Sequence, residues 1–184
     1  MTSAVAKKTG SSFISDVSAL RARARQHIED GAVTQSYAAD RETVLKLLNE
    51  ALATEIVCVL RYKRHFFMAD GINSEAVKQE FLEHANQEQQ HADAIAARIV
   101  QLGGEPNFNP EGITTRSHAE YKEGRTLRDM ITEDLVAERI AIESYSEMVA
   151  YLEGHDPTTR KLLEGILAVE EEHAEDMATL LKQI

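Results

Sequence analysis

The sequence is poor in the residues that mark several other classes of protein. Its 184 residues include no tryptophan, three prolines and one cysteine, and aromatic residues make up 5 %. The single cysteine, Cys58, excludes an intrachain disulfide, and no thiolates cluster for a structural zinc site. No apolar run is long enough to cross a membrane, and no apolar segment of a secretion signal follows Lys7 and Lys8. We therefore expect a cytoplasmic protein with no membrane partner.

Basic charge is scarce outside the N-terminal segment. The chain carries 20 Lys and Arg against 31 Asp and Glu, for a formal net charge of −11. This balance disfavours broad affinity for nucleic acids or anionic membranes and suits the attraction of cations. Residues 1–28 differ, because they hold five basic residues and only Asp16 as an acid. Such an arm could contact DNA in a salt-dependent manner, but packing on a neighbouring subunit is the favoured interpretation.

Helix-forming sequence dominates the rest of the chain. No run of alternating β-branched residues occurs, so we predict an all-α protein. Residues 1–39 form an expected N-terminal arm, disordered over 1–12 and with a possible short helix over 13–30. Residues 40–184 form the expected helical domain. Cap and turn signals divide that domain into four long helices, at about 40–69, from 73 or 74 to 102, 126–153 and 157–184.

The connections between the four predicted helices indicate their topology. Short turns join the first helix to the second and the third to the fourth, so each of these pairs should be antiparallel. The segment 105–125 contains Pro106, Pro110 and Gly112 and is unusually long for a link between helices. It can cross the whole bundle, which lets helices two and three run parallel. We predict a four-helix bundle with one long crossover between helices two and three.

Each predicted helix carries an apolar stripe that is interrupted near its middle by acids or histidine. Spacings of three and four place the members of a stripe on one helix face, the face that packs into a core. A lone buried carboxylate is costly unless it is neutralised, paired or bound to a cation. The polar members of the four stripes are Glu55 in the first helix, His84, Glu88 and His91 in the second, Asp134 and Glu138 in the third, and Glu170 and His173 in the fourth.

The pattern of these polar residues points to a metal site. One Glu-x-x-His pair is weak evidence, since a glutamate-rich chain produces such a pair by accident. Here both pairs, Glu88/His91 and Glu170/His173, fall on core stripes, and Glu55 and Glu138 occupy equivalent interior positions. Residues i and i+3 project side by side from a helix and can hold one ion. Four carboxylates balance two divalent cations, and mixed carboxylate and imidazole ligands suit iron or manganese.

At these residues the chain resembles the ferritin superfamily, and bacterioferritin most closely. The resemblance covers about residues 41–184 and rests on LNEALATEIVCVLRY (48–62), EQQH (88–91), DLVAERIAIESY (134–145) and EEEH (170–173). It implies a ferritin-like four-helix bundle with two iron ions per subunit, for which manganese or zinc can substitute. The carboxylates bridging both irons would be Glu88 and Glu170.

The resemblance also implies roles for the other site residues. Glu55 and His91 would complete one iron site, and Glu138 and His173 the other. Tyr62 would lie beside the centre. Asp134, one turn before Glu138, is a candidate acceptor for a hydrogen bond from a ligand imidazole.

Two departures from the bacterioferritin pattern bear on cofactor and assembly. Gln89 stands where bacterioferritins have the methionine that ligates haem, so the resemblance gives no support for haem. Few residues follow His173, so we expect no fifth helix of the kind that lines the channels of 24-subunit ferritins. Dodecameric Dps-like cages lack that helix. A Dps-like homo-oligomeric cage of 12 subunits is therefore favoured over one of 24.

The favoured hypothesis is a ferroxidase and iron-storage cage that oxidises ferrous iron with O₂ or H₂O₂, mineralises it and limits oxidative stress. The first alternative is a non-storing di-metal redox enzyme, such as a rubrerythrin-like peroxidase or a manganese catalase. The absence of a Cys-x-x-Cys pair counts against rubrerythrin. The second alternative is a Dps-like DNA-protecting protein that binds DNA through its N-terminal arm.

Overall fold

The computed structural model describes residues 16–71 and 74–184, and these residues form helices and no strands. The described chain falls into two units, one ending at Ser36 and one running from Tyr37 to Ile184. The all-α prediction is confirmed. In chain order the helices are α1 (Val17–Arg23), the 3₁₀ helix η1 (Ile28–Asp30), α2 (Arg41–Met68), α3 (Ser74–Gln101), α4 (Ile113–Arg116), α5 (Leu127–Leu152) and α6 (Pro157–Gln183).

The first unit contains two short helices in place of the single helix expected over 13–30. Asp16 caps α1 by accepting hydrogen bonds from the backbone N–H groups of Ser18 and Ala19. No residue of α1 is buried, and His27 takes a left-handed conformation between α1 and η1. The start of the expected helix and the disorder predicted for 1–12 lie outside the described residues.

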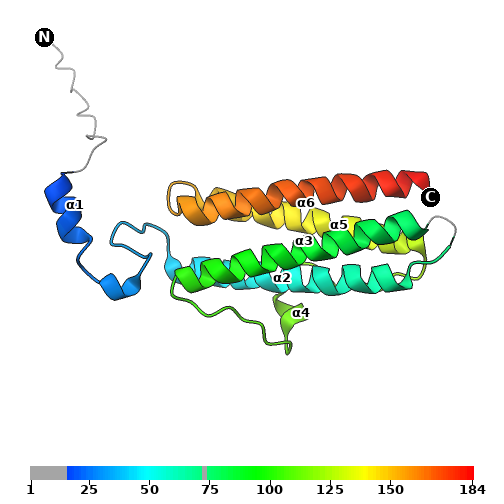
Figure 1. The fold of residues 1–184 in the computed structure, drawn as a ribbon, viewed down its shortest axis with the longest axis horizontal. Helices are drawn as coiled ribbons and strands as arrows, with labels where there is room; N and C mark the ends of the chain where they lie inside the picture. Colours follow the sequence, from blue (N-terminus) through cyan, green and yellow to red (C-terminus); the bar gives the residue numbers. More distant parts are fainter. Residues whose placement is uncertain (1–15, 72–73) are drawn as a thin grey trace, which may run out of the picture. The chain divides into compact units, whose positions relative to one another are not determined.

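The second unit is a four-helix bundle built from α2, α3, α5 and α6 (Figure 1). Helix α2 packs along α3 and α5 packs along α6, as the short turns between them predict. Both α3 and α5 run from the end nearest the C-terminus toward the opposite end, so the crossover joins parallel helices (Figure 1). The predicted bundle with one long crossover is confirmed. None of the described helices is long and apolar enough to span a membrane.

Local sequence determines where the long helices begin and end. The carboxylate of Asp40 accepts hydrogen bonds from backbone N–H groups in the first turn of α2. Thr126 and Asp129 form a reciprocal capping box at the start of α5. Asp156 caps α6, and Pro157 takes the first helical position, where no backbone N–H is needed. These caps fix the register of the helices and so the height at which each polar core residue lies.

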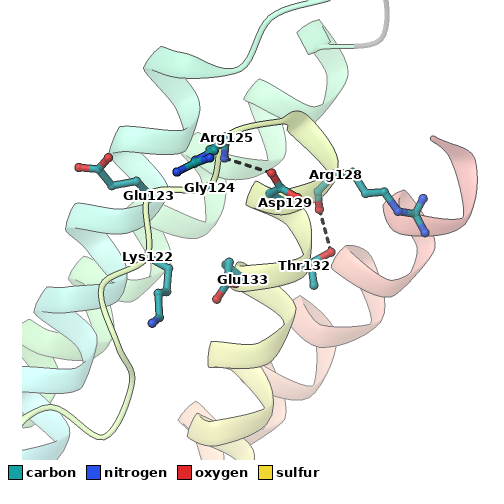
Figure 2. A pocket seen from close by; sticks show the side chains of 8 residues that line it. All are labelled: Lys122, Glu123, Gly124, Arg125, Arg128, Asp129, Thr132 and Glu133. Carbon is teal, nitrogen blue, oxygen red and sulfur yellow. Dashed lines mark hydrogen bonds between the residues drawn. The ribbon is translucent and has the colours of Figure 1, made fainter.

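The crossover ends in a surface pocket at the start of α5 (Figure 2). The Asp129 carboxylate there accepts hydrogen bonds from the backbone N–H groups of Arg125 and Thr126, at 3.3 and 3.0 Å. Thr132 donates to the carbonyl of Arg128 at 2.8 Å. Both basic and acidic side chains line the pocket. The hydrogen bonds of Asp129 and Thr132 are made to the backbone, so they stabilise the start of α5. The lining residues are Lys122, Glu123, Gly124, Arg125, Arg128, Asp129, Thr132 and Glu133.

A buried ion pair ties the crossover to the bundle. Arg61 of α2 donates from Nε to Asp134 of α5 at 2.8 Å and from Nη1 to the carbonyl of Glu120 at 3.1 Å. His65 lies one turn further, with Nδ1 2.8 Å from Asp134 and Nε2 3.1 Å from the carbonyl of Lys122. Arg61, His65 and Asp134 are each at most 1 % exposed. The network therefore joins α2, α5 and the crossover in the interior.

We predict that Arg61→Met destabilises the fold by about 3–5 kcal/mol, because it leaves a buried carboxylate without its strongest partner. Urea unfolding followed by circular dichroism measures the change. Lys46→Met is the matched control, since Lys46 is exposed and its pair with Glu50 is worth at most about 1 kcal/mol. Equal stability of the two variants would refute the structural role of the pair.

Candidate metal centre

Six side chains from all four long helices meet in the middle of the bundle. Glu55 comes from α2, Glu88 and His91 from α3, Glu138 from α5, and Glu170 and His173 from α6. None is more than 8 % exposed. We call this set the buried cluster. The structure brings together all six residues that the sequence singled out as candidate metal ligands.

The buried cluster divides into two overlapping groups, one around each histidine. Nδ1 of His91 lies 3.4 Å from Glu55, and Nδ1 of His173 lies 3.8 Å from Glu138. Glu170 directs one oxygen to each ring, Oε1 to His91 at 2.9 Å and Oε2 to His173 at 3.6 Å. Glu88 does the same, at 3.4 and 3.6 Å. Two carboxylates therefore span both groups, and each group has four side chains able to hold one cation.

Most of the inward-facing atoms of the buried cluster lack a hydrogen-bond partner. Buried polar groups in folded proteins are normally hydrogen-bonded, because an unpaired one costs about 1–3 kcal/mol. A cation among these atoms would satisfy several of them at once. Carboxylate oxygen and imidazole nitrogen are donors that iron, manganese and zinc accept. The unpartnered atoms are Oε2 of Glu55, Oε1 of Glu88, Nδ1 of His91, Oε2 of Glu138, both carboxylate oxygens of Glu170 and Nδ1 of His173.

Burial sets the ionisation of the carboxylates. It raises the pKa of Glu55 well above its ordinary value, and the charge of Glu88 adds to that rise. Burial and the charge of Glu55 likewise raise the pKa of Glu170 to about 7. Burial also opposes ionisation of Glu138, but its interactions with His173 and Glu170 outweigh burial and lower its pKa to about 2. Glu55, Glu138 and Glu170 thus differ in how firmly they hold protons.

Protons on the two histidines offset part of this negative charge. Burial disfavours the charged form of His91, but the neighbouring carboxylates of Glu170, Glu55 and Glu88 outweigh burial and raise its pKa to about 12. The pKa of His173 rises to about 12 because the neighbouring carboxylates of Glu138, Glu170 and Glu88 overcome the effect of its burial. Metal binding requires neutral imidazole, so a cation entering the cluster would displace these protons.

Two tyrosines donate hydrogen bonds to Glu55 and Glu138, the two glutamates that each lie in only one of the overlapping groups. Tyr62 of α2 donates its hydroxyl hydrogen to Glu138 of α5, and Tyr145 of α5 donates to Glu55 of α2. The sequence prediction placed Tyr62 beside the centre and missed Tyr145. The spacing could have revealed it, because Tyr145 follows Glu138 by the seven residues that separate Tyr62 from Glu55.

Asp134 does not have the hydrogen bonds predicted for it. We expected it to accept from a ligand imidazole, but its two oxygens face Arg61 and His65 of α2. The side chain of Asp134 projects from α5 toward α2 and the crossover, and there the charged guanidinium of Arg61 is a stronger hydrogen-bond donor than a ligand imidazole. Gln87, which the sequence did not single out, has its Oε1 2.6 Å from Nε2 of His173 instead.

The metal-free protein should lose stability as pH rises from about 5 to 8. The folded state raises the pKa of Glu55, Glu170 and both cluster histidines, so it binds protons more tightly than the unfolded chain. That stabilisation is present below the unfolded pKa values and disappears as pH rises toward the folded ones. Glu138 and His84 have lowered pKa values and act oppositely, Glu138 below about pH 4.5 and His84 below about pH 6.5, so the net loss comes from the four groups with raised pKa values.

We therefore predict that Glu55→Gln stabilises the metal-free protein by about 1–3 kcal/mol at pH 8 and by less at pH 5. The amide oxygen can still accept from Tyr145 while the charge is gone. Urea denaturation at both pH values tests this, with exposed Glu143→Gln as the control. A Glu55→Gln variant less stable than wild type at pH 8 would contradict the electrostatic account.

Comparison with known proteins assigns the chain to a family. The Ferritin-like domain family matches residues 45–184. The chain is 32 % identical to a bacterioferritin of Mycobacterium leprae over 139 residues, which cover 75 % of this chain and 83 % of that protein. It is 35 % identical to the DNA protection during starvation protein of Pyrococcus furiosus over 138 residues, 73 % of this chain and 74 % of that one.

The fold has close counterparts among solved structures as well. A dodecameric thioferritin related to bacterioferritin, from Bacteroides fragilis, superimposes with a TM-score of 0.77 and 30 % identity. The similarity covers 79 % of this chain and 88 % of that one. Together with the family match over the whole bundle, these similarities show that the chain belongs to the ferritin-like family.

Proposed function

We propose that this protein is a ferroxidase that stores iron, binding two ferrous ions per chain in the buried cluster and oxidising them. The observation that carries the proposal is the set of unpartnered oxygen and nitrogen atoms, from four helices, that face one another in the buried interior of the bundle. No purely structural role explains four carboxylates there. Bacterioferritin and thioferritin relatives support iron as the substrate.

In this proposal each half of the buried cluster holds one iron ion. Glu55 and His91 bind the first, Glu138 and His173 bind the second, and Glu88 and Glu170 bridge both. The bridging role is supported by the two oxygens of each carboxylate, which are directed to different histidines. Four negative charges balance two divalent ions, and they favour the more highly charged ferric product over the ferrous substrate.

Two adjacent ferrous ions match the electron demand of the oxidant. Each ion gives up one electron, so the pair reduces one O₂ with two protons to H₂O₂, or one H₂O₂ with two protons to two water molecules. Use of peroxide without one-electron steps limits radical formation, which links storage to protection from oxidative stress. The protein contributes by holding both ions at fixed positions and by excluding bulk water.

We further propose that the ferric product is stored as mineral inside a homo-oligomeric cage of 12 subunits in the cytoplasm. The relative from Bacteroides fragilis is dodecameric, and it is similar to this chain across the bundle. Residues 40–184 would build the cage wall, and residues 1–39 would form an arm that packs on a neighbouring subunit. Gln89, in place of a haem-ligating methionine, supports a cage without haem.

Replacement of both bridging carboxylates should abolish rapid ferrous oxidation. We expect Glu88→Ala combined with Glu170→Ala to lower the initial rate at least about 100-fold, since loss of a ligand exceeds the effect of losing an outer partner. Stopped-flow absorbance of the ferric product gives the rate, and circular dichroism checks helicity. Glu143→Ala with Glu171→Ala, two exposed glutamates on the same bundle, is the control. Oxidation at the wild-type rate in the first variant would refute the site.

The assembly can be measured independently of chemistry. Light scattering coupled to size-exclusion chromatography should give a mass of about 12 times 20.5 kDa for the full chain. This mass would distinguish a storage cage from an isolated redox enzyme, which would elute as a dimer or a monomer. A mass that corresponds to 24 subunits would agree with the storage proposal but would refute the proposed number of subunits.

A further inference from the structure

A second group of potential ligands lies outside the buried cluster, between α3 and α6. Glu80 and His84 stand four residues apart on α3, so they project from the same helix face. Asp176 projects from α6, and the ligand atoms of all three side chains lie within 4.8 Å of one another. We call these three residues the outer triad. None of them is among the six ligands of the ferroxidase site proposed above, although His84 also lies close to Glu138 and His173.

The hydrogen bonds of Tyr62 determine which nitrogen of His84 carries a proton. A tyrosine hydroxyl has one hydrogen, and Tyr62 donates it to Glu138. Nδ1 of His84 lies 3.2 Å from the same hydroxyl oxygen, so Nδ1 must donate and the oxygen must accept. In a neutral imidazole this arrangement leaves Nε2 as an unprotonated lone pair.

That lone pair is directed at two carboxylates. Nε2 of His84 lies 3.5 Å from Oδ2 of Asp176 and 3.9 Å from Oε2 of Glu80. Both separations exceed the usual length of a hydrogen bond, which is about 2.7–3.2 Å. A lone pair facing two negatively charged oxygens is repulsive unless a positive charge lies between them. The ring cannot move away easily, because His84 is 2 % exposed and stacks on His173 with centroids 3.9 Å apart.

The dimensions of the outer triad suit a small divalent cation. Ligand atoms at about 2.1 Å from one ion lie roughly 3.0–3.4 Å from one another in octahedral or tetrahedral geometry. The observed 3.5 and 3.9 Å need only small side-chain shifts to reach these values. The side chains of Glu80 and Asp176 are 42 % and 46 % exposed, so an ion can enter from solvent and keep water in its remaining positions.

We propose that Glu80, His84 and Asp176 bind a third divalent cation per chain, at the surface between α3 and α6. Two carboxylates and one imidazole are a donor set that zinc, manganese and ferrous iron accept. The ring of His84 would lie between this ion and the buried cluster, since it stacks on the ring of His173, a member of the cluster. This site does not depend on the ferroxidase activity proposed above, since its ligands are different side chains.

Zinc titration of the full-length protein tests this site. Isothermal titration calorimetry of the wild type should give three Zn²⁺ per chain, two for the buried cluster and one for the outer triad. Glu80→Gln combined with Asp176→Asn should lose one Zn²⁺ per chain and keep the other two. The matched control, Glu83→Gln with Glu175→Gln, removes two exposed acids next to the triad and should leave the count unchanged.

A cluster-deficient background distinguishes this proposal from the ferroxidase proposal. With Glu88→Ala and Glu170→Ala in place, one Zn²⁺ per chain should remain, and it should vanish when Glu80→Gln and Asp176→Asn are added. Retention of that ion in the fourfold variant, or the same stoichiometry in wild type and the Glu80→Gln/Asp176→Asn variant, would overturn the outer site. Either result would leave the ferroxidase proposal untouched.

Discussion

The burial of four carboxylates in the interior of one bundle is the constraint on which this structure depends. An isolated buried charge costs several kcal/mol, so the fold must supply compensation. His91 and His173, with pKa values raised to about 12, and the hydroxyls of two tyrosines supply part of it. Seven inward-facing atoms still lack a partner. The bundle thus carries an electrostatic cost that bound cations would remove, as expected of a site kept for function rather than stability.

The buried cluster is built from two similar halves. The hairpin α2–α3 supplies one glutamate and one Glu-x-x-His pair, and the hairpin α5–α6 supplies the same set. Each hairpin also supplies a tyrosine seven residues after its single glutamate, and each tyrosine donates to the glutamate of the other hairpin. These crossed bonds hold the halves together across the centre. An arrangement of this kind has two similar groups of potential cation ligands, which would suit a reaction in which two electrons leave from two ions.

Much of the fold and the candidate site could be predicted from the sequence, because both depend on periodicity. Stripes with a helical period fix which face is buried, so Glu55 and Glu138 were found although neither belongs to a short motif. The direction of a side chain across the bundle could not be predicted in the same way. Asp134 lies on the core face as expected, yet it contacts Arg61 and His65 because of how α5 faces α2. The crossover contributes only backbone carbonyls to that network, and these leave no trace in the sequence.

The most direct test of the account is the location of iron in the crystal. Crystals soaked anaerobically with ferrous iron should give two anomalous peaks per chain within the buried cluster at the iron absorption edge, whether or not a further peak lies at the outer triad. One should lie between Glu55 and His91, the other between Glu138 and His173, and Glu88 and Glu170 should contact both. An anomalous map without iron among these six side chains, in crystals that bind iron elsewhere, would contradict the central claim.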